Sequence, residues 1–183
     1  MPSPVDSLIQ HFLITGEIPA STPSQELSVL SIAIAPEILG AGIVPALTKS
    51  YVFSAGIIPL LEPISFWMRR HDLGLTVCSE HANDLLLMAL QIQAQNHGLP
   101  LSMGLAHGNG LVLDTGEWIA VARMQADRMA QIGGHHQITA SMPFIQSLEA
   151  LPEGIGGLPL NRSTLELIGF SAVLIRDFRS LDQ

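Results

Sequence analysis

The apolar and polar positions along the chain follow the period of strands in some segments and of helices in others. LSVLSIAIA, ending at Ala35, is a continuous apolar run of strand length, which is typical of a central strand covered on both faces. Segments 62–70 and 73–78 alternate apolar and polar positions around a short polar turn, which predicts a hairpin. We expect further strands at 101–107, 110–114, 136–141 and 169–178, with a second hairpin turn at Gly108–Gly110.

Helical spacing occupies the segments between these strands. The clearest case is 80–97, where an apolar stripe repeats every three or four residues. A second helix is predicted from about 117 to 132, with Trp118 turned inward. Residues 36–61 are apolar with scattered glycine and proline, which indicates one or two helices with a break near Gly56.

The first residues read as an appendage to a single domain. Helical spacing over 5–14 is followed by a polar stretch with two prolines, so we assign 1–26 to an N-terminal helical arm and linker. The remaining residues, 27–183, suit one domain of ordinary size. The order of elements predicts an α+β sandwich, in which helices pack against a mainly antiparallel sheet.

Composition narrows the possible partners. Hydrophobic residues make up 48% of the chain and charged residues 13%, so some apolar surface is expected to face a partner protein, with a homodimer the first expectation. The net charge of -8, with one lysine, argues against nucleic acid as a partner.

The lone Cys78 lies in an apolar run and predicts a buried thiol in the cytoplasm. The N-terminal apolar stretch is short and interrupted, so neither a signal peptide nor a membrane helix is expected. The arm carries no lysine or arginine for anionic lipid, so membrane binding is not expected either.

Three segments carry a family resemblance. MQADRMAQIGGHHQITAS, residues 124–141, matches the spacing of a helix with Asn-x-Ala-Ala-Arg-Leu followed by Gly-Gln-Ile and a serine. Segments 98–113 and 71–93 look like a strand with a Gly-Ile-His-x-Gly turn, and like a Gly-Asp hairpin with its following helix. Together, over about 27–180, they resemble the class III nucleotide cyclase homology domain, the catalytic domain of adenylate and guanylate cyclases. The resemblance implies a ferredoxin-like sandwich and a head-to-tail dimer.

The same resemblance makes carboxylates the test of activity. Cyclases of this family attack the α-phosphate with a ribose 3′-hydroxyl, using two divalent metals held by aspartates. The first aspartate belongs to the opening strand, yet LSVLSIAIAP contains no acidic residue. The second corresponds to Asp72, although His71 replaces the preceding glycine. Asp72 is therefore the one remaining metal ligand that the resemblance implies.

The nucleotide-binding residues are also incomplete. The asparagine of the helix motif is Met124 here, while the arginine survives as Arg128, a remnant of the catalytic pair. Met68 stands in the place of the base-reading lysine, and a second base-reading residue falls between Glu117 and Val121 without a definite register. A structural role for Arg128, pairing with a neighbouring subunit or capping a surface, ranks ahead of a catalytic one.

These observations predict a catalytically degenerate, cyclase-like domain that acts in signalling as a regulatory or protein-interaction module, with the apolar surface and N-terminal arm as contacts. No cofactor is expected, and a nucleotide ligand stays open. The alternative is an active adenylate or guanylate cyclase in which Glu37 or Glu62 joins Asp72 in holding Mg²⁺ or Mn²⁺. A diguanylate cyclase ranks last, because its Gly-Gly-Asp/Glu-Glu-Phe signature is absent.

Two other patterns invite a ligand. His135 and His136 could bind a metal with His107, but neighbours entering a strand point to opposite faces, so a solvated turn is the better interpretation. The glycines around Asn109 precede a strand and not a helix, which argues for a turn and against phosphate binding.

Overall fold

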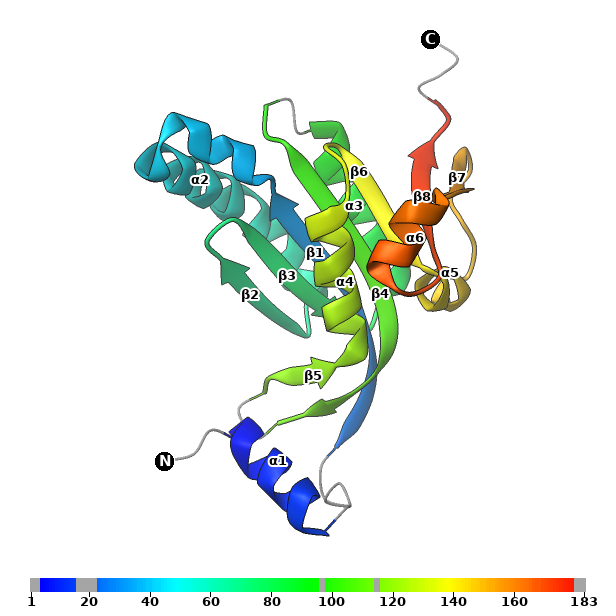
Figure 1. Cartoon of the computed structure of the whole chain (residues 1–183). Helices are drawn as coiled ribbons and strands as arrows, with labels where there is room; N and C mark the ends of the chain where they lie inside the picture. The colour runs from blue at the N-terminus through cyan, green and yellow to red at the C-terminus, as the bar shows by residue number, and fades with distance from the viewer. Residues whose placement is uncertain (1–3, 16–22, 96–97, 114–115, 180–183) are drawn as a thin grey trace.

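The computed structural model describes residues 4–15, 23–95, 98–113 and 116–179. Its centre is an eight-stranded sheet in the order β2-β3-β1-β4-β6-β8-β7, with β5 paired to β4 (Figure 1). The strands are β1 (Ser24–Ile34), β2 (Trp67–His71), β3 (Gly74–Ser79), β4 (Leu101–Val112), β5 (Trp118–Ala120), β6 (Gln137–Ser141), β7 (Ile155–Pro159) and β8 (Ala172–Asp177). β4 and β6 run parallel, and the other described pairs are antiparallel.

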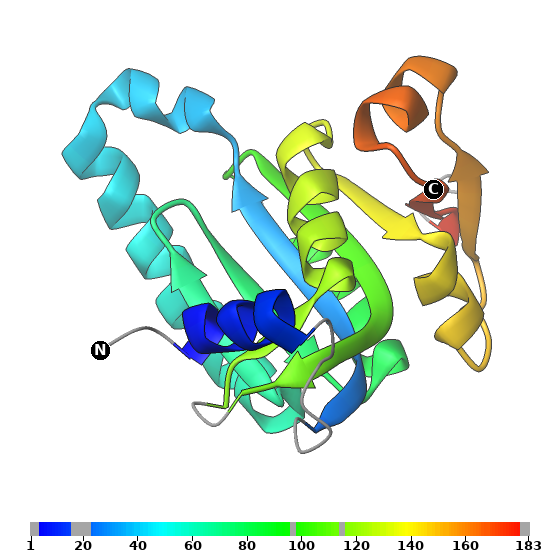
Figure 2. The same cartoon turned by 60° about the horizontal axis from the view of Figure 1, so that its bottom comes forward.

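Helices cover both faces of this sheet, which confirms the predicted α+β sandwich. They are α1 (Pro4–Thr15), η1 (Pro36–Ala41), α2 (Ile43–Leu61), η2 (Glu62–Ile64), α3 (Ala82–Gln95), α4 (Val121–Ile132), α5 (Met142–Ser147) and α6 (Arg162–Ile168). One hydrophobic cluster joins α2, α3 and α5 to the sheet, and a second joins α4 and α6 to the opposite face. Figure 2 shows α4 lying across the middle strands, with α2 along one side of the molecule.

The strand β1 is central, as its apolar run predicts. Leu30 belongs to the cluster under α3 and Val29 to the cluster under α4, so alternate residues fill both cores. β1 pairs with β3 on one side and along its full length with β4 on the other. It begins at Ser24, so the last residues of the predicted linker belong to the strand, while 16–22 lie outside the described residues.

The predicted turn at Gly108–Gly110 is wrong. These residues continue a single strand, β4, and the hairpin is formed by β4 with β5. A Cβ at Gly110 would lie 2.5 Å from Nε1 of Trp118, so this glycine permits close packing. Trp118 itself is fully buried in β5 and donates to the carbonyl of Gln25, and α4 begins only at Val121.

The break predicted near Gly56 is also misplaced. α2 runs through Gly56 without interruption, and the chain turns at Gly42 between η1 and α2. Gly42 has a φ of 98°, a conformation that favours glycine. Sequence alone does not distinguish a glycine tolerated on an exposed helix from one that a turn requires.

Candidate functional site

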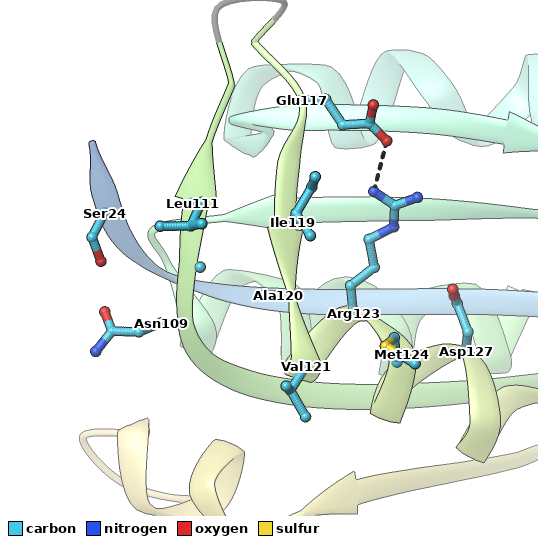
Figure 3. Close-up of a pocket in the computed structure, with 11 residues that line it drawn as sticks. Ser24, Asn109, Leu111, Glu117, Ile119, Ala120, Val121, Arg123, Met124 and Asp127 are labelled. Atoms are coloured by element: carbon cyan, nitrogen blue, oxygen red, sulfur yellow. Dashed lines mark hydrogen bonds and ion pairs between the residues drawn. The ribbon is translucent and has the colours of Figure 1, made fainter. Parts of the chain in front are cut away.

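Two cavities lie along α4 and share Asp127 as a lining residue. The first, of about 630 Å³, opens beside the β4–β5 hairpin and α4 (Figure 3). The second, of about 430 Å³, lies between the end of β1, the β2–β3 turn and α4. We call the two together the α4 trough; its lining includes Asn109, Glu117, Ile119, Arg123, Met124, Asp127, Ser31, His71, Asp72 and Gln131.

Arg123 organises the first cavity. Its Nη1 donates to Oε1 of Glu117 at 3.0 Å and to the carbonyl of Trp118 at 3.1 Å (Figure 3). Its guanidinium also lies 4.8 Å from the ring centroid of Trp67, a cation–π distance. Glu117, the first residue of the range that the resemblance connects with base reading, is therefore engaged by Arg123, and Arg69 lies 3.9 Å from the same oxygen.

Asp127 links the helix to two strands at the junction of the cavities. Its Oδ1 accepts from Oγ of Ser31 at 2.7 Å and from Oγ1 of Thr76 at 3.1 Å. Nε2 of His71 lies 2.9 Å from Oγ1 of Thr76. Because Thr76 gives its only proton to Asp127, Nε2 of His71 must donate to Thr76. Ser31 and Thr76 are buried, so this carboxylate supplies an acceptor to two hydroxyls that have little access to water.

Asp72 lies in the turn between β2 and β3 and lines the second cavity, as the hairpin prediction places it. Its backbone carbonyl accepts from Oγ of Ser50, which fixes the turn against α2. The cavity receives two carboxylates, from Asp72 and Asp127, and one imidazole, from His71. None of its lining residues is a lysine or arginine, so its charged groups disfavour an unaccompanied phosphate.

Arg128 points away from both cavities. Its Nη2 donates to the carbonyl of Leu167 at 3.0 Å, in the last turn of α6. A cation at this position satisfies a helix-terminal carbonyl and complements the helix dipole. The structure thus does not bring Arg128 together with Asp72. Met124, one turn earlier on α4, does line the first cavity and is 71% exposed.

The residues present do not fit a pair of divalent metals. Glu37 in η1 and Glu62 in η2, the carboxylates considered as substitutes, do not line the second cavity with Asp72. Within the described residues, no three His, Cys, Asp or Glu side chains converge closely enough to hold a metal ion. Asp127 reaches this region from α4, yet its Oδ1 already accepts two hydroxyl protons.

The histidines considered as metal ligands lie apart. His135 and His136 are exposed after α4, in the turn before β6, with His135 3.9 Å from Glu37. His107 lies on β4, where Nδ1 is 2.9 Å from Oγ of Ser28 and Nε2 is 3.1 Å from Glu26.

Cys78 belongs to the core beneath the trough, as its apolar surroundings predict. It is fully buried in β3, and burial raises the pKa of its thiol to about 12. The nearby Arg123 and Asp127 act on this pKa in opposite directions and change it less. A thiol in this state is a packing residue and a poor nucleophile.

The sequence analysis missed Asp127 and Arg123 as the organising charges of the trough. In the Asn-x-Ala-Ala-Arg-Leu motif, Asp127 stands in the place of the second alanine, which gives no indication of its partners. A usable signal was the pair of hydroxyl residues, Ser31 and Thr76, placed among apolar residues on two predicted strands. Buried hydroxyls need partners, and a carboxylate on a facing helix is one way to supply them.

Comparison with solved structures identifies the fold. No family model matches the sequence. No curated protein sequence matches it either. The chain is structurally similar to the adenylate/guanylate cyclase/hydrolase from Silicibacter pomeroyi, with a TM-score of 0.65, 15% identity, and coverage of 85% of this chain and 97% of that one. It is also similar to the guanylate cyclase domain of RhGC from Catenaria anguillulae, solved in complex with GTP, with a TM-score of 0.63, 12% identity and coverage of 85% and 99%.

A third similar structure is the dimeric guanylyl cyclase domain of the RhoGC fusion protein from Blastocladiella emersonii, with a TM-score of 0.62, 12% identity and coverage of 85% and 98%. These similarities confirm the fold that the resemblance implied, and they extend over most of the length of each similar structure. At such identities they establish the fold alone.

Proposed function

We propose that this chain, which has the fold of the class III nucleotide cyclase catalytic domains, is a catalytically degenerate member of that fold that acts as a regulatory or protein-interaction module. The observation that carries the proposal is the second cavity. Its acidic lining residues are Asp72, in an exposed turn, and Asp127, whose Oδ1 is already engaged by Ser31 and Thr76, and β1 adds no acidic side chain to it from its apolar run.

Cyclisation of a nucleoside triphosphate needs positive charge near the phosphates. Divalent metals supply it by activating the 3′-hydroxyl and neutralising the triphosphate. Here Asp72 is an exposed turn residue, and the Oδ1 of Asp127 is engaged by Ser31 and Thr76. A single exposed carboxylate holds Mg²⁺ weakly, so the proposed regulatory function does not use a metal cofactor.

The place of the transition-state-stabilising pair supports the same conclusion. Met124 cannot donate a hydrogen bond, and Arg128 is used to cap α6. Both positions of the helix motif thus serve the fold or its surface. A polar pair that had kept its function would be expected to direct both side chains toward one cavity.

A partner protein is the occupant that we propose for the apolar end of the trough, in the cytoplasm. Val121 and Met124 are 68% and 71% exposed at its edge, and together they offer apolar area that a partner could cover. A second copy of the chain is the first candidate, because one of the similar structures is described as a dimeric cyclase domain.

An active cyclase is the second candidate, and one observation favours it. Asp127 brings a carboxylate from α4 into the cavity that Asp72 lines, in compensation for the acid missing from β1. Activity would then depend on both aspartates.

Calorimetric titration with ATP and GTP in the presence of Mg²⁺ or Mn²⁺, together with an assay for cyclic product in the same samples, tests the proposal. We expect no product. Product formation that is lost in Asp72→Asn and in Asp127→Asn, but kept in the exposed control Glu153→Gln, would contradict it and establish the active alternative.

A further inference from the structure

The helix α2 is unusually apolar for a helix on the outside of the fold. Within the described residues, the segment Ile43–Ile64 is the one helix long and apolar enough to cross a membrane by length and composition, and 22% of its most apolar window is buried. A core helix would be buried over most of its length. In Figures 1 and 2, α2 lies along the edge of the molecule, with η1 next to its first turns.

The inner side of α2 is committed to the domain. Its buried residues recur at helical spacing and face the sheet: Ala46, Ser50, Ser54, Ile57 and Leu61. Ser50 also donates to the backbone carbonyl of Asp72, which ties the middle of the helix to the β2–β3 turn. A helix packed in this way cannot cross a bilayer without unfolding the domain. It can lie flat on a surface.

The outer side of α2 exposes large apolar side chains over the first half of the helix. We define the outer face of α2 by the residues Val44, Leu47, Tyr51 and Val52, which are 42% to 72% exposed and lie away from the buried side of the helix. From Val44 to Val52, at 1.5 Å per residue, this face spans roughly 12 Å. Large apolar side chains gathered on one side of an exposed helix mark a surface that something covers.

The charges of this region select among possible occupants. The helix contains no aspartate or glutamate, and its single charge is Lys49, the only lysine of the chain. Arg70 of β2 adds a second cation, with its guanidinium 4.6 Å from the ring centroid of Tyr51. The chain as a whole has a net charge of -8, so this cationic helix is the exception, and the nearest acid along the chain, Glu62, lies just beyond its end.

We propose that the outer face of α2 rests in the interfacial layer of an anionic membrane. Aliphatic side chains and a tyrosine, accompanied by Lys49 and Arg70, are the combination that binds acyl chains and anionic headgroups together. A specific protein interface would add hydrogen-bonding side chains to the apolar face, whereas the exposed polar residues of α2 are only Thr48, Lys49 and Tyr51. This proposal departs from the expectation of no membrane contact, which rested on the N-terminal arm alone.

Vesicle co-sedimentation of the full chain provides the test, with phosphatidylcholine vesicles and with mixed phosphatidylcholine–phosphatidylserine vesicles. We expect binding to the mixed vesicles that weakens as salt is raised. The double variant Val44→Ser/Val52→Ser should bind roughly tenfold or more weakly, because it has less apolar area to bury in the bilayer. Lys49→Glu/Arg70→Glu should reduce binding to the mixed vesicles only.

The matched control is Leu87→Ser/Leu167→Ser, which removes exposed apolar side chains, 50% and 55% exposed, from α3 and α6. It should bind vesicles like the unmodified chain. The proposal is overturned if no vesicle is bound, or if the control loses binding as strongly as the α2 variant. A different result would also overturn the proposal: the unmodified chain does not bind vesicles, and light scattering shows that Val44→Ser/Val52→Ser converts a dimer into a monomer. The outer face of α2 would then join two copies of the chain.

Discussion

The carboxylate of Asp127 on α4 accepts the hydroxyl proton of Ser31 on β1 across 2.7 Å, and this bond fastens the helix to the central strand. Thr76 on β3 donates to the same oxygen, so one side chain joins three elements. The bonded hydroxyls are buried, and removal of the carboxylate leaves both of them without a hydrogen-bond acceptor. Stability should therefore be more sensitive at this position than its place on a helix surface suggests.

Asp127→Ala should lower the free energy of unfolding by about 1–3 kcal/mol, because two buried hydroxyls lose their acceptor. Urea unfolding followed by circular dichroism measures this change. The triple variant Ser31→Ala/Thr76→Val/Asp127→Ala also removes the two unbonded hydroxyls and should recover most of the lost free energy of unfolding. Equal stability of the single variant and the unmodified chain would refute the structural role of Asp127.

Arg128→Ala should release the end of α6 and leave any nucleotide binding unchanged. The lost hydrogen bond to Leu167 is exposed, so the cost to stability is about 0.5–1 kcal/mol. Hydrogen exchange should accelerate in α6 and not in α3. Arg162→Ala, which removes an exposed pair with Glu166 in the same helix, serves as the control and should have a smaller effect. Loss of measurable ATP or GTP affinity in Arg128→Ala alone would assign the side chain to a ligand.

Gly104→Ala should destabilise the fold strongly. A Cβ at Gly104 on β4 would lie 2.1 Å from the carbonyl oxygen of Ala126, so α4 would have to move away from the sheet. The expected cost is about 1–3 kcal/mol or more. Gly56→Ala is the matched control, because nothing lies within 4 Å of its added carbon and alanine favours the helix by roughly 0.5–1 kcal/mol. Thermal unfolding of the two variants should shift in opposite directions.

Cys78 should make stability fall in alkaline solution. Its pKa is about 12 in the folded chain and near 9.0 when exposed, so the unfolded chain loses this proton first as the pH rises. Its contribution is complete below pH 9 and declines between pH 9 and 12, by at most about 1.4 kcal/mol per pH unit. Urea unfolding at pH 8 and pH 10 should show a larger loss for the unmodified chain than for Cys78→Ala. At pH 8 a thiol reagent should react only after unfolding, and rapid reaction of the folded chain would contradict this account.

Segments with strong local signals could be predicted from the sequence. The apolar run of β1 and the stripe of α3 appear in the structure close to the expected place. The alternation over 62–70 forms a strand only from Trp67, because residues 62–64 form η2. Glycines were less informative, because the same residue serves opposite purposes. Gly42 makes a turn, while Gly110 lies within a strand and makes room for Trp118.

The site was harder to predict, because its bonds join residues distant in the chain. Asp127 and Ser31 are 96 positions apart, and Asp127 and Thr76 are 51 apart. The helix motif identified Arg128 by spacing, but spacing does not say which side of α4 faces the trough. The direction of Arg128 depends on α6, a short helix that the sequence analysis did not delimit.

The position of Asp127 on the border of both cavities would couple ligands bound at the two ends of the α4 trough. An occupant of either end that draws this carboxylate away from Ser31 and Thr76 must work against those bonds, and a second occupant would then find them already broken. Such coupling is reciprocal: if the first ligand changes the affinity for the second by some factor, the second changes the affinity for the first by the same factor. A shared side chain would thereby allow one binding event to affect the other.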